Sequence, residues 1–154
     1  MFTVTLDGEA EFAAEVRAFC EALQRGAEHA VEAACKAGAD EAKRGAFKDH
    51  TGNLRGKIIG VLLSAPTGGG AEGEIRSPMQ YSSYVEEGTE PHVIEARRRK
   101  SLKWTDATGT HFAKSVQHPG TKSIPFMGRA YIVAERVLPA RMEEAAAEAG
   151  KVFK

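Results

Sequence analysis

This 154-residue chain has few cysteine and tryptophan residues, two Cys and one Trp. It also has no net charge, because 21 basic residues balance 21 acidic ones. A general nucleic-acid binder is usually basic, so the formal net charge of 0 argues against that class. The same balance leaves self-association unopposed by charge. No apolar run is long enough to span a membrane, and no signal-peptide pattern follows Met1. The sequence therefore predicts a protein made in the cytoplasm, with no membrane partner.

The two cysteines, Cys20 and Cys35, fall on one predicted helix. Fifteen helical residues separate their Cα atoms by about 22 Å, far beyond the reach of a disulfide. We expect free thiols, as suits a reducing compartment, and two small hydrophobic side chains that face the core.

Signatures of catalysis and cofactor binding are missing as well. No GxSxG elbow surrounds the candidate nucleophiles, and the glycine run lacks the GxxxxGK[ST] pattern that cradles phosphate. A metal site can be imagined from five side chains whose spacing matches no HxxxH or HExxH motif: His92, His111, His118, Glu95 and Asp106. The candidate nucleophiles are Ser82, Ser83 and Ser115. We expect no enzyme, no metal and no cofactor, with a small metal-dependent enzyme built on the histidines as an alternative.

Two long helices are predicted, one at each end of the chain. Residues from about 9 to 47 are rich in Ala, Glu, Arg and Lys, and their apolar side chains recur at steps of three and four. Gly38 marks a plausible bend. A second helix is expected from Pro125 to about Gly150, with Pro at its first turn and a kink at Pro139.

The middle of the chain, about residues 51–122, is predicted to be a β-region with one short helix. Lys57–Ser64 and Glu72–Ser77 read as a hairpin, and Gln80–Glu87 as a helix ended by Gly88. Further strand candidates begin at Pro91, at Leu102 and at His111, the last running to Val116; Phe2–Leu6 adds a short N-terminal strand. The aromatic side chains are expected to fill a core between sheet and helices: Tyr81, Tyr84, Trp104, Phe112 and Phe126.

The resulting fold class is α+β, with the long N-terminal helix and the C-terminal helix packed on a small, mostly antiparallel β-sheet. A length of 154 residues suits a single domain, residues 1–154.

Two segments stand out as candidate contact sites. Arg97-Arg98-Arg99-Lys100 is the one dense run of charge, and it suits either a solvated loop or a contact with DNA phosphates or an acidic partner. The glycine-rich hairpin tip suits either a plain loop or a loop that orders on a partner, with Pro66, Thr67, Gly68, Gly69 and Gly70 as its candidate docking residues.

Between about Thr51 and Ala134, an ordered set of motifs resembles the small tail-completion or head–tail joining proteins of long-tailed bacteriophages. The motifs read YVEEGT, HVI, LKW, HPGTK and PFM, in that order. Their main residues, which are expected to define the fold, are Tyr84, Glu86, Gly88, Thr89, His92, Trp104, His118, Pro119, Gly120, Thr121, Pro125 and Phe126. Ser123 departs from the pattern, which has Pro after the Lys, and Gly128-Arg129 stands where Arg-Pro is common.

The resemblance implies a structural virion protein with no catalytic role. Such proteins form a ring, commonly hexameric, that completes the tail and joins it to the head connector. The implied partners are further copies of the chain, a head-side connector protein, the tail tube or tail terminator protein, and genomic DNA passing through the lumen. A tail terminator that caps the tube is the nearest alternative, and a nucleic-acid-binding module built on Arg97–Lys100 is a more distant one.

Overall fold

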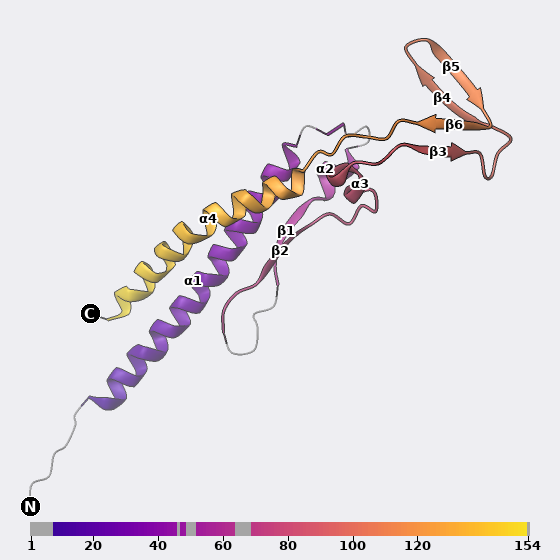
Figure 1. Ribbon diagram of the computed structural model, residues 1–154. Helices are drawn as coiled ribbons and strands as arrows, with labels where there is room; N and C mark the ends of the chain where they lie inside the picture. The colour runs from indigo at the N-terminus through magenta and orange to yellow at the C-terminus, as the bar shows by residue number, and fades with distance from the viewer. Residues whose placement is uncertain (1–7, 46, 49–51, 64–68, 154) are drawn as a thin grey trace, which may run out of the picture. The chain divides into compact units, whose positions relative to one another are not determined.

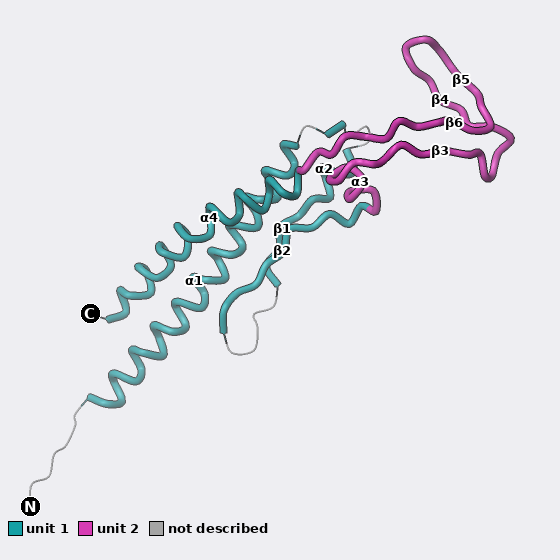
Figure 2. Tube along the Cα trace, viewed as in Figure 1, with its two compact units in different colours: residues 1–79, 126–154 teal, residues 80–125 magenta. Residues whose placement is uncertain are grey.

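The protein is described by a computed structural model over residues 8–45, 47–48, 52–63 and 69–153 (Figure 1). The predicted strand Phe2–Leu6 lies outside these residues. Two compact units make up the chain: unit 1 comprises residues 1–79 and 126–154, and unit 2 comprises residues 80–125 (Figure 2). That residues 1–154 form a single domain stays a prediction.

Unit 1 is built on helix α1, Glu9–Lys43. Its residues are mostly strong helix formers, and Glu9 and Glu11 in the first turn complement the positive end of the helix dipole. Helix α1 continues without a break through Gly38, and the bend expected there stays a prediction. Gly38 has another purpose: a Cβ there would lie 2.4 Å from Ile75 Cδ1 and 2.7 Å from the Ala130 carbonyl oxygen, so its absence lets neighbouring elements pack closely.

Helix α1 ends at Lys43 rather than at the predicted residue 47. Tertiary contacts bind the backbone of the residues that follow Lys43. Arg55, from the short helix α2 (Asn53–Lys57), donates hydrogen bonds to the carbonyl oxygens of Lys43, Gly45 and Phe47, the last two at 2.8 and 2.9 Å. Its guanidinium also lies 4.5 Å from the centroid of the Phe47 ring. One cation thus binds the carbonyl oxygen of the last helical residue and two carbonyl oxygens of the segment that follows it.

Replacing Arg55 by Lys is expected to lower the free energy of unfolding by about 2 kcal/mol. An ammonium group cannot reach three carbonyl oxygens in the fork geometry of a guanidinium, and charged hydrogen bonds contribute about 1.5–3 kcal/mol each. Chemical denaturation checks this value. Arg44→Lys is the control, because Arg44 makes an exposed ion pair with Glu41 and should change stability by less than about 0.5 kcal/mol.

Helix α4, Phe126–Ala149, lies along α1 in the opposite direction and is followed by the 3₁₀ turn η1, Gly150–Val152 (Figure 1). Gly38 of α1 faces Ala130, whereas Gly26 faces Ala145, where an added Cβ would come within 2.6 Å of the alanine methyl group. Small residues at these crossings let the two backbones approach closely. Pro139 lies inside α4, and the kink expected there stays a prediction.

A β-hairpin, β1 (Ile59–Leu62) with β2 (Gly73–Arg76), packs against α1. Both strands are shorter than the predicted segments Lys57–Ser64 and Glu72–Ser77. Gly60 lies so close to α1 that a Cβ there would come within 2.2 Å of the Cys35 carbonyl oxygen.

The core of unit 1 is built mainly from small side chains of the two helices, joined by Phe47, Leu54, Ile58 and Phe126. Of the five aromatic residues expected in a core, Phe126 alone is buried, at 1% exposure. The expectation was wrong for Tyr81, Tyr84, Trp104 and Phe112, because the segments that carry them are covered by no second layer.

Unit 2 contains the short helix α3, Ser82–Glu87, and two antiparallel ladders. Strand β3 (His92–Glu95) pairs with β6 (Ser115–His118), and β4 (Leu102–Asp106) pairs with β5 (Gly109–Ala113). The single strand expected from His111 to Val116 was wrong, because the chain changes pairing partner at Lys114. Alternation of side chains cannot reveal such a change, since both ladders have the same period.

The fold class is α+β, as predicted, with long N- and C-terminal helices and small antiparallel sheets. The predicted single sheet is not continuous, because the described residues form three separate two-stranded ladders. No helix in the described ranges has the length and apolar character needed to cross a membrane.

Candidate interaction site

Two of the sequence motifs, YVEEGT and HPGTK, pair with each other within unit 2. Thr89 and Thr121 exchange backbone hydrogen bonds of 3.0 Å in both directions, and their hydroxyl oxygens lie 3.1 Å apart. Gly88 and Gly120 have positive φ values of 78° and 84°, and a Cβ on either would collide with backbone atoms of the opposite segment. The segments YVEEGT and HPGTK therefore need glycine where their backbones meet.

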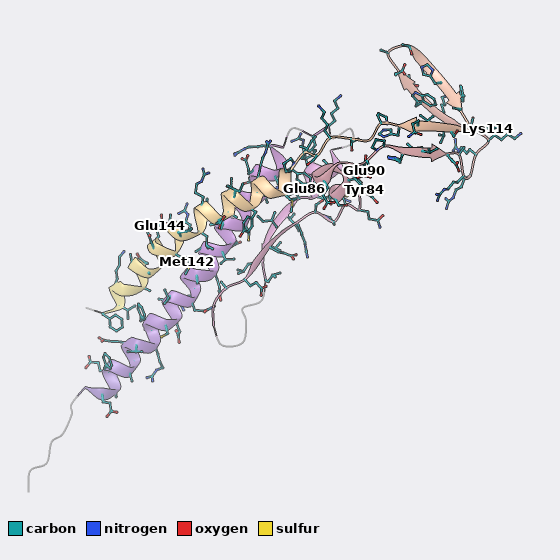
Figure 3. All side chains as sticks on the ribbon, in the orientation of Figure 1. Tyr84, Glu86, Glu90, Lys114, Met142 and Glu144 are labelled. Atoms are coloured by element: carbon teal, nitrogen blue, oxygen red, sulfur yellow. The ribbon has the colours of Figure 1, made fainter. Side chains whose placement is uncertain are left out.

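Ser123, which departs from the motif pattern, also has a structural contact. Its hydroxyl donates a 2.6 Å hydrogen bond to the Glu86 carbonyl oxygen, beside a backbone bond from Ile124 N–H to Val85 O. A proline at this position could not make the hydroxyl contact. Tyr84, on α3, is 63% exposed and is available to a partner (Figure 3).

The histidines do not converge on a metal. His92 and His118 are cross-strand partners with ring centroids 5.1 Å apart, but His111 lies in the other ladder. His92 donates Nδ1–H to the Glu90 carbonyl oxygen, whereas His118 Nδ1 accepts from Gly120 N–H, which places the proton of a neutral His118 on Nε2. Within the described part of the chain, no group of three His, Cys, Asp or Glu side chains could hold a metal ion.

A polar cluster orders the turn between β4 and β5. Asp106 Oδ1 accepts hydrogen bonds from the N–H and hydroxyl groups of Thr108, at 2.8 and 2.6 Å, and from His111 Nε2 at 3.1 Å. The His111 ring stacks on Trp104, with centroids 5.2 Å apart. The hydrogen bonds from Thr108, followed by that from His111, lower the pKa of Asp106 below its ordinary value of 3.8. A turn at Asp106 and Gly109 is what the sequence predicts between the two strands. The hydrogen bonds from Thr108 and His111 were not indicated by the sequence.

The turn should lose order only in strong acid. A carboxyl whose pKa is lowered by folding stabilises the folded turn above its unfolded pKa and ceases to do so as the pH falls through the folded pKa. We therefore expect the Thr108 amide resonance to shift with a midpoint below pH 3.8 in NMR spectra. Asp106→Asn should abolish that titration, and a midpoint at or above 3.8 in the wild-type protein would contradict the hydrogen-bonding pattern.

The basic run follows directly after β3. Ala96 N–H donates to the carbonyl oxygen of Lys114, which is labelled in Figure 3, so the run begins one residue after this contact at the end of the β3–β6 ladder. Between His92 and His118, six Lys or Arg residues accompany two acidic ones, so this segment has a formal charge of +4 in a chain whose total is 0. None of these six cations is joined to a carboxylate within 4 Å by a described ion pair.

Unit 2 has no core of its own. None of its 46 residues is buried, although all are described. Each of its four strands pairs with one neighbour, so each has a free edge. Large apolar side chains are left in contact with solvent, namely Tyr81, Tyr84, Val93, Ile94, Trp104 and Phe112. Two-stranded ladders with an exposed apolar surface are marginally stable in water.

The glycine-rich loop is described only at its end. Pro66, Thr67 and Gly68 lie outside the described residues. The side-chain amide of Gln24, on α1, accepts from Gly70 N–H at 2.9 Å and donates to the Gly70 carbonyl oxygen at 2.6 Å. This contact, which the sequence did not indicate, holds the end of the loop against unit 1.

The remaining candidates for chemistry do not form a catalytic arrangement. Cys20 and Cys35 are free thiols on α1, as predicted, but Cys20 is exposed rather than in the core. Burial, and then the negative charge of Glu74, raise the pKa of the Cys35 thiol, which disfavours a nucleophilic thiolate. A groove of about 680 Å³ between α1 and α4 is lined by alanines and by polar or charged side chains, namely Ala22, Ala30, Ala33, Ala145 and Ala149 with Arg25, His29, Arg141, Glu144 and Glu148.

Comparison with known proteins identifies a family. Residues 10–88, slightly more than half of the chain, match the HK97-gp10-like family model, described as "Bacteriophage HK97-gp10, putative tail-component". No match was found among curated proteins or among solved structures.

The matched region contains α1, α2, the β1–β2 hairpin and α3. It overlaps the resemblance seen in the sequence from Thr51 to Gly88, and it adds the long helix α1, which precedes those motifs. The HPGTK and PFM motifs lie beyond it. The helix, the hairpin and the YVEEG segment are therefore what relate this chain to known proteins, and the chain belongs to the HK97-gp10-like family of bacteriophage tail components.

Proposed function

We propose that this tail component acts at the head–tail junction, where copies of the chain form a ring that completes the tail and joins it to the head connector. The observation that carries the proposal is the absence of any buried residue in unit 2. A surface with free strand edges and exposed apolar side chains gains stability by pairing with another chain. The catalytic requirement of an enzyme, a set of converging titratable groups, is met by no cluster among the described residues.

A ring follows from contacts in which one copy's surface binds a different surface of the next copy. Such heterologous contacts close into a ring when the rotation between copies allows it. A net charge of 0 imposes no overall repulsion between copies. The ring would contact a head-side connector protein and the tail tube or tail terminator protein, with genomic DNA passing through the lumen.

Purified tails that lack this protein and have no heads provide the test. Added protein is expected to restore head attachment without changing the length of the tail tube, and electron microscopy of the restored particles should show a ring at the junction. Control of tube length without restored attachment would assign the terminator role instead. A protein absent from particles and without effect on tails would overturn the proposal.

A further inference from the structure

We propose that the basic loop, Arg97–Lys100 of unit 2, docks on the acidic first part of α1, Glu9–Ala18, in a second copy of this chain. The inference rests on the proposed ring, because it assigns the two surfaces through which neighbouring copies meet. It commits to a protein partner for the loop rather than to DNA.

The acidic surface is the free end of α1. Helix α4 ends at Ala149, which lines the groove between the two helices together with Ala22, and the ring of Phe153 packs on that of Phe19, with centroids 5.1 Å apart. Residues Glu9–Ala18 precede these contacts, and none of them is buried. Phe12 is 64% exposed in the middle of this segment.

The surface Glu9–Ala18 has three acidic residues and one basic residue, Arg17, and thus a formal charge of −2. Helix α1 has eight acidic and four basic residues, a formal charge of −4. Its ion pairs with Lys, Arg or His begin at Glu21, so the three acids of the free end make none: Glu9, Glu11 and Glu15.

The two surfaces are complementary in charge and in apolar character. The loop offers four consecutive cations, and the helix end offers three carboxylates. Neither set has a described ion-pair partner in its own chain. Trp104 and Phe112, which follow the loop in unit 2, are exposed, as is Phe12 on the acidic helix end. A contact of opposite charges around apolar side chains is the usual composition of a specific protein interface.

Within unit 1, the acidic surface lies at the end of α1 away from the point where the chain returns from unit 2. Helix α1 has 35 residues and is therefore about 52 Å long. The chain returns from unit 2 at Phe126, whose ring packs 4.9 Å from Phe47, just beyond the C-terminal end of α1. The acidic surface is at the other end of this helix. Repetition of one surface binding a different surface of the next copy is the geometry of a heterologous ring.

Two charge-reversed proteins test the contact. The loop variant carries Arg97→Glu, Arg98→Glu, Arg99→Glu and Lys100→Glu; the helix variant carries Glu9→Lys, Glu11→Lys and Glu15→Lys. Each alone should self-associate at least about 100-fold more weakly than wild type, because every contact now joins like charges. Mixed in equal amounts they should assemble again, since an alternating ring has opposite charges at every contact. Sedimentation velocity and native mass spectrometry at low salt measure both effects.

Controls distinguish this contact from a general effect of charge and from loss of folding. Reversal of three exposed acids on α4, Glu135, Glu143 and Glu144, should leave self-association within about twofold of wild type, and circular dichroism should show unchanged helicity in all variants. A mixture that does not reassemble, single variants that associate normally, or a wild-type protein that stays monomeric at low salt would each overturn the inference. The head–tail role would survive those outcomes if the protein still restored head attachment. Loss of binding to double-stranded DNA by the loop variant, with self-association unchanged, would overturn the inference and assign the loop to nucleic acid.

Discussion

Gly60→Ala is expected to lower the free energy of unfolding by about 3 kcal/mol, a large loss for a single added methyl group. Gly60 lies in β1, where a Cβ would come within 2.2 Å of the Cys35 carbonyl oxygen and 2.4 Å of the Cys35 carbonyl carbon. These are backbone atoms of α1, so no side-chain rotation can relieve the collision. The strand and the helix must separate, and overpacking of this kind costs about 1–3 kcal/mol or more.

Two other glycines provide graded controls for this measurement. A Cβ on Gly73 would meet the Sγ of Cys35 and Cγ1 of Val31, at 2.6 and 2.7 Å, and side-chain atoms can move aside. Gly73→Ala should therefore cost less, about 1–2 kcal/mol. Gly56 lies in α2 with nothing within 4 Å of its added Cβ, so Gly56→Ala should stabilise the protein by up to about 1 kcal/mol. Equal effects at Gly60 and Gly56 in urea denaturation would show that the hairpin does not rest on α1 in solution.

The local pattern of the sequence predicted the helices well, and their ends less well. The repeat of apolar residues placed α1 and α4, because a continuous helical face is visible in the sequence. It extended α1 by four residues, since Arg44 and the residues after it have no strong helix-breaking signal apart from Gly45. The end is decided by Arg55, which lies 12 residues after Lys43 and binds its carbonyl oxygen. A pattern of neighbouring residues in the sequence does not reveal such a tertiary contact.

The prediction of the core was wrong for a similar physical reason, because burial also depends on tertiary contacts that the local sequence does not reveal. Large aromatic residues are usually buried, so Trp104 and Phe112 were assigned to a core. The structure instead places the tight packing at alanines and glycines of α1 and α4, where small side chains let two backbones meet. Which aromatic residues find a covering layer depends on how the ladders are arranged, and alternation within a strand does not contain that information.

The candidate site was predicted in part. The basic run and the motif glycines were visible in the sequence, and the structure places Gly88 and Gly120 on two segments that pair. Three features were not visible: the free edges of the ladders, the unpaired acids on α1, and the clamp between Gln24 and Gly70. Each depends on which residues lie beside one another in three dimensions.

Phe126→Ala is expected to lower the free energy of unfolding by about 3–5 kcal/mol, which is comparable to a large share of the 5–15 kcal/mol that stabilises a typical domain. Phe126 is the first residue of α4 and is 1% exposed. Its ring packs 4.9 Å from that of Phe47, and its Cβ lies so close to Gly45 that a methyl group there would come within 2.9 Å. Truncation would leave a cavity where α4 meets the end of α1, and it would also loosen the ring on which the Arg55 guanidinium rests.

Tyr131 on the same helix is the matched control. It is also aromatic but is 65% exposed, so Tyr131→Ala removes little packing within the chain and should change the free energy of unfolding by less than about 0.5 kcal/mol. Urea denaturation followed by circular dichroism measures both variants, at low protein concentration so that self-association does not contribute. A loss below about 1 kcal/mol for Phe126→Ala would contradict the packing at the start of α4. An equal loss for both variants would instead show that the two faces of α4 are equally buried, contrary to the structure. The difference between the two values is therefore the quantity that decides whether α4 is anchored to α1 through Phe126.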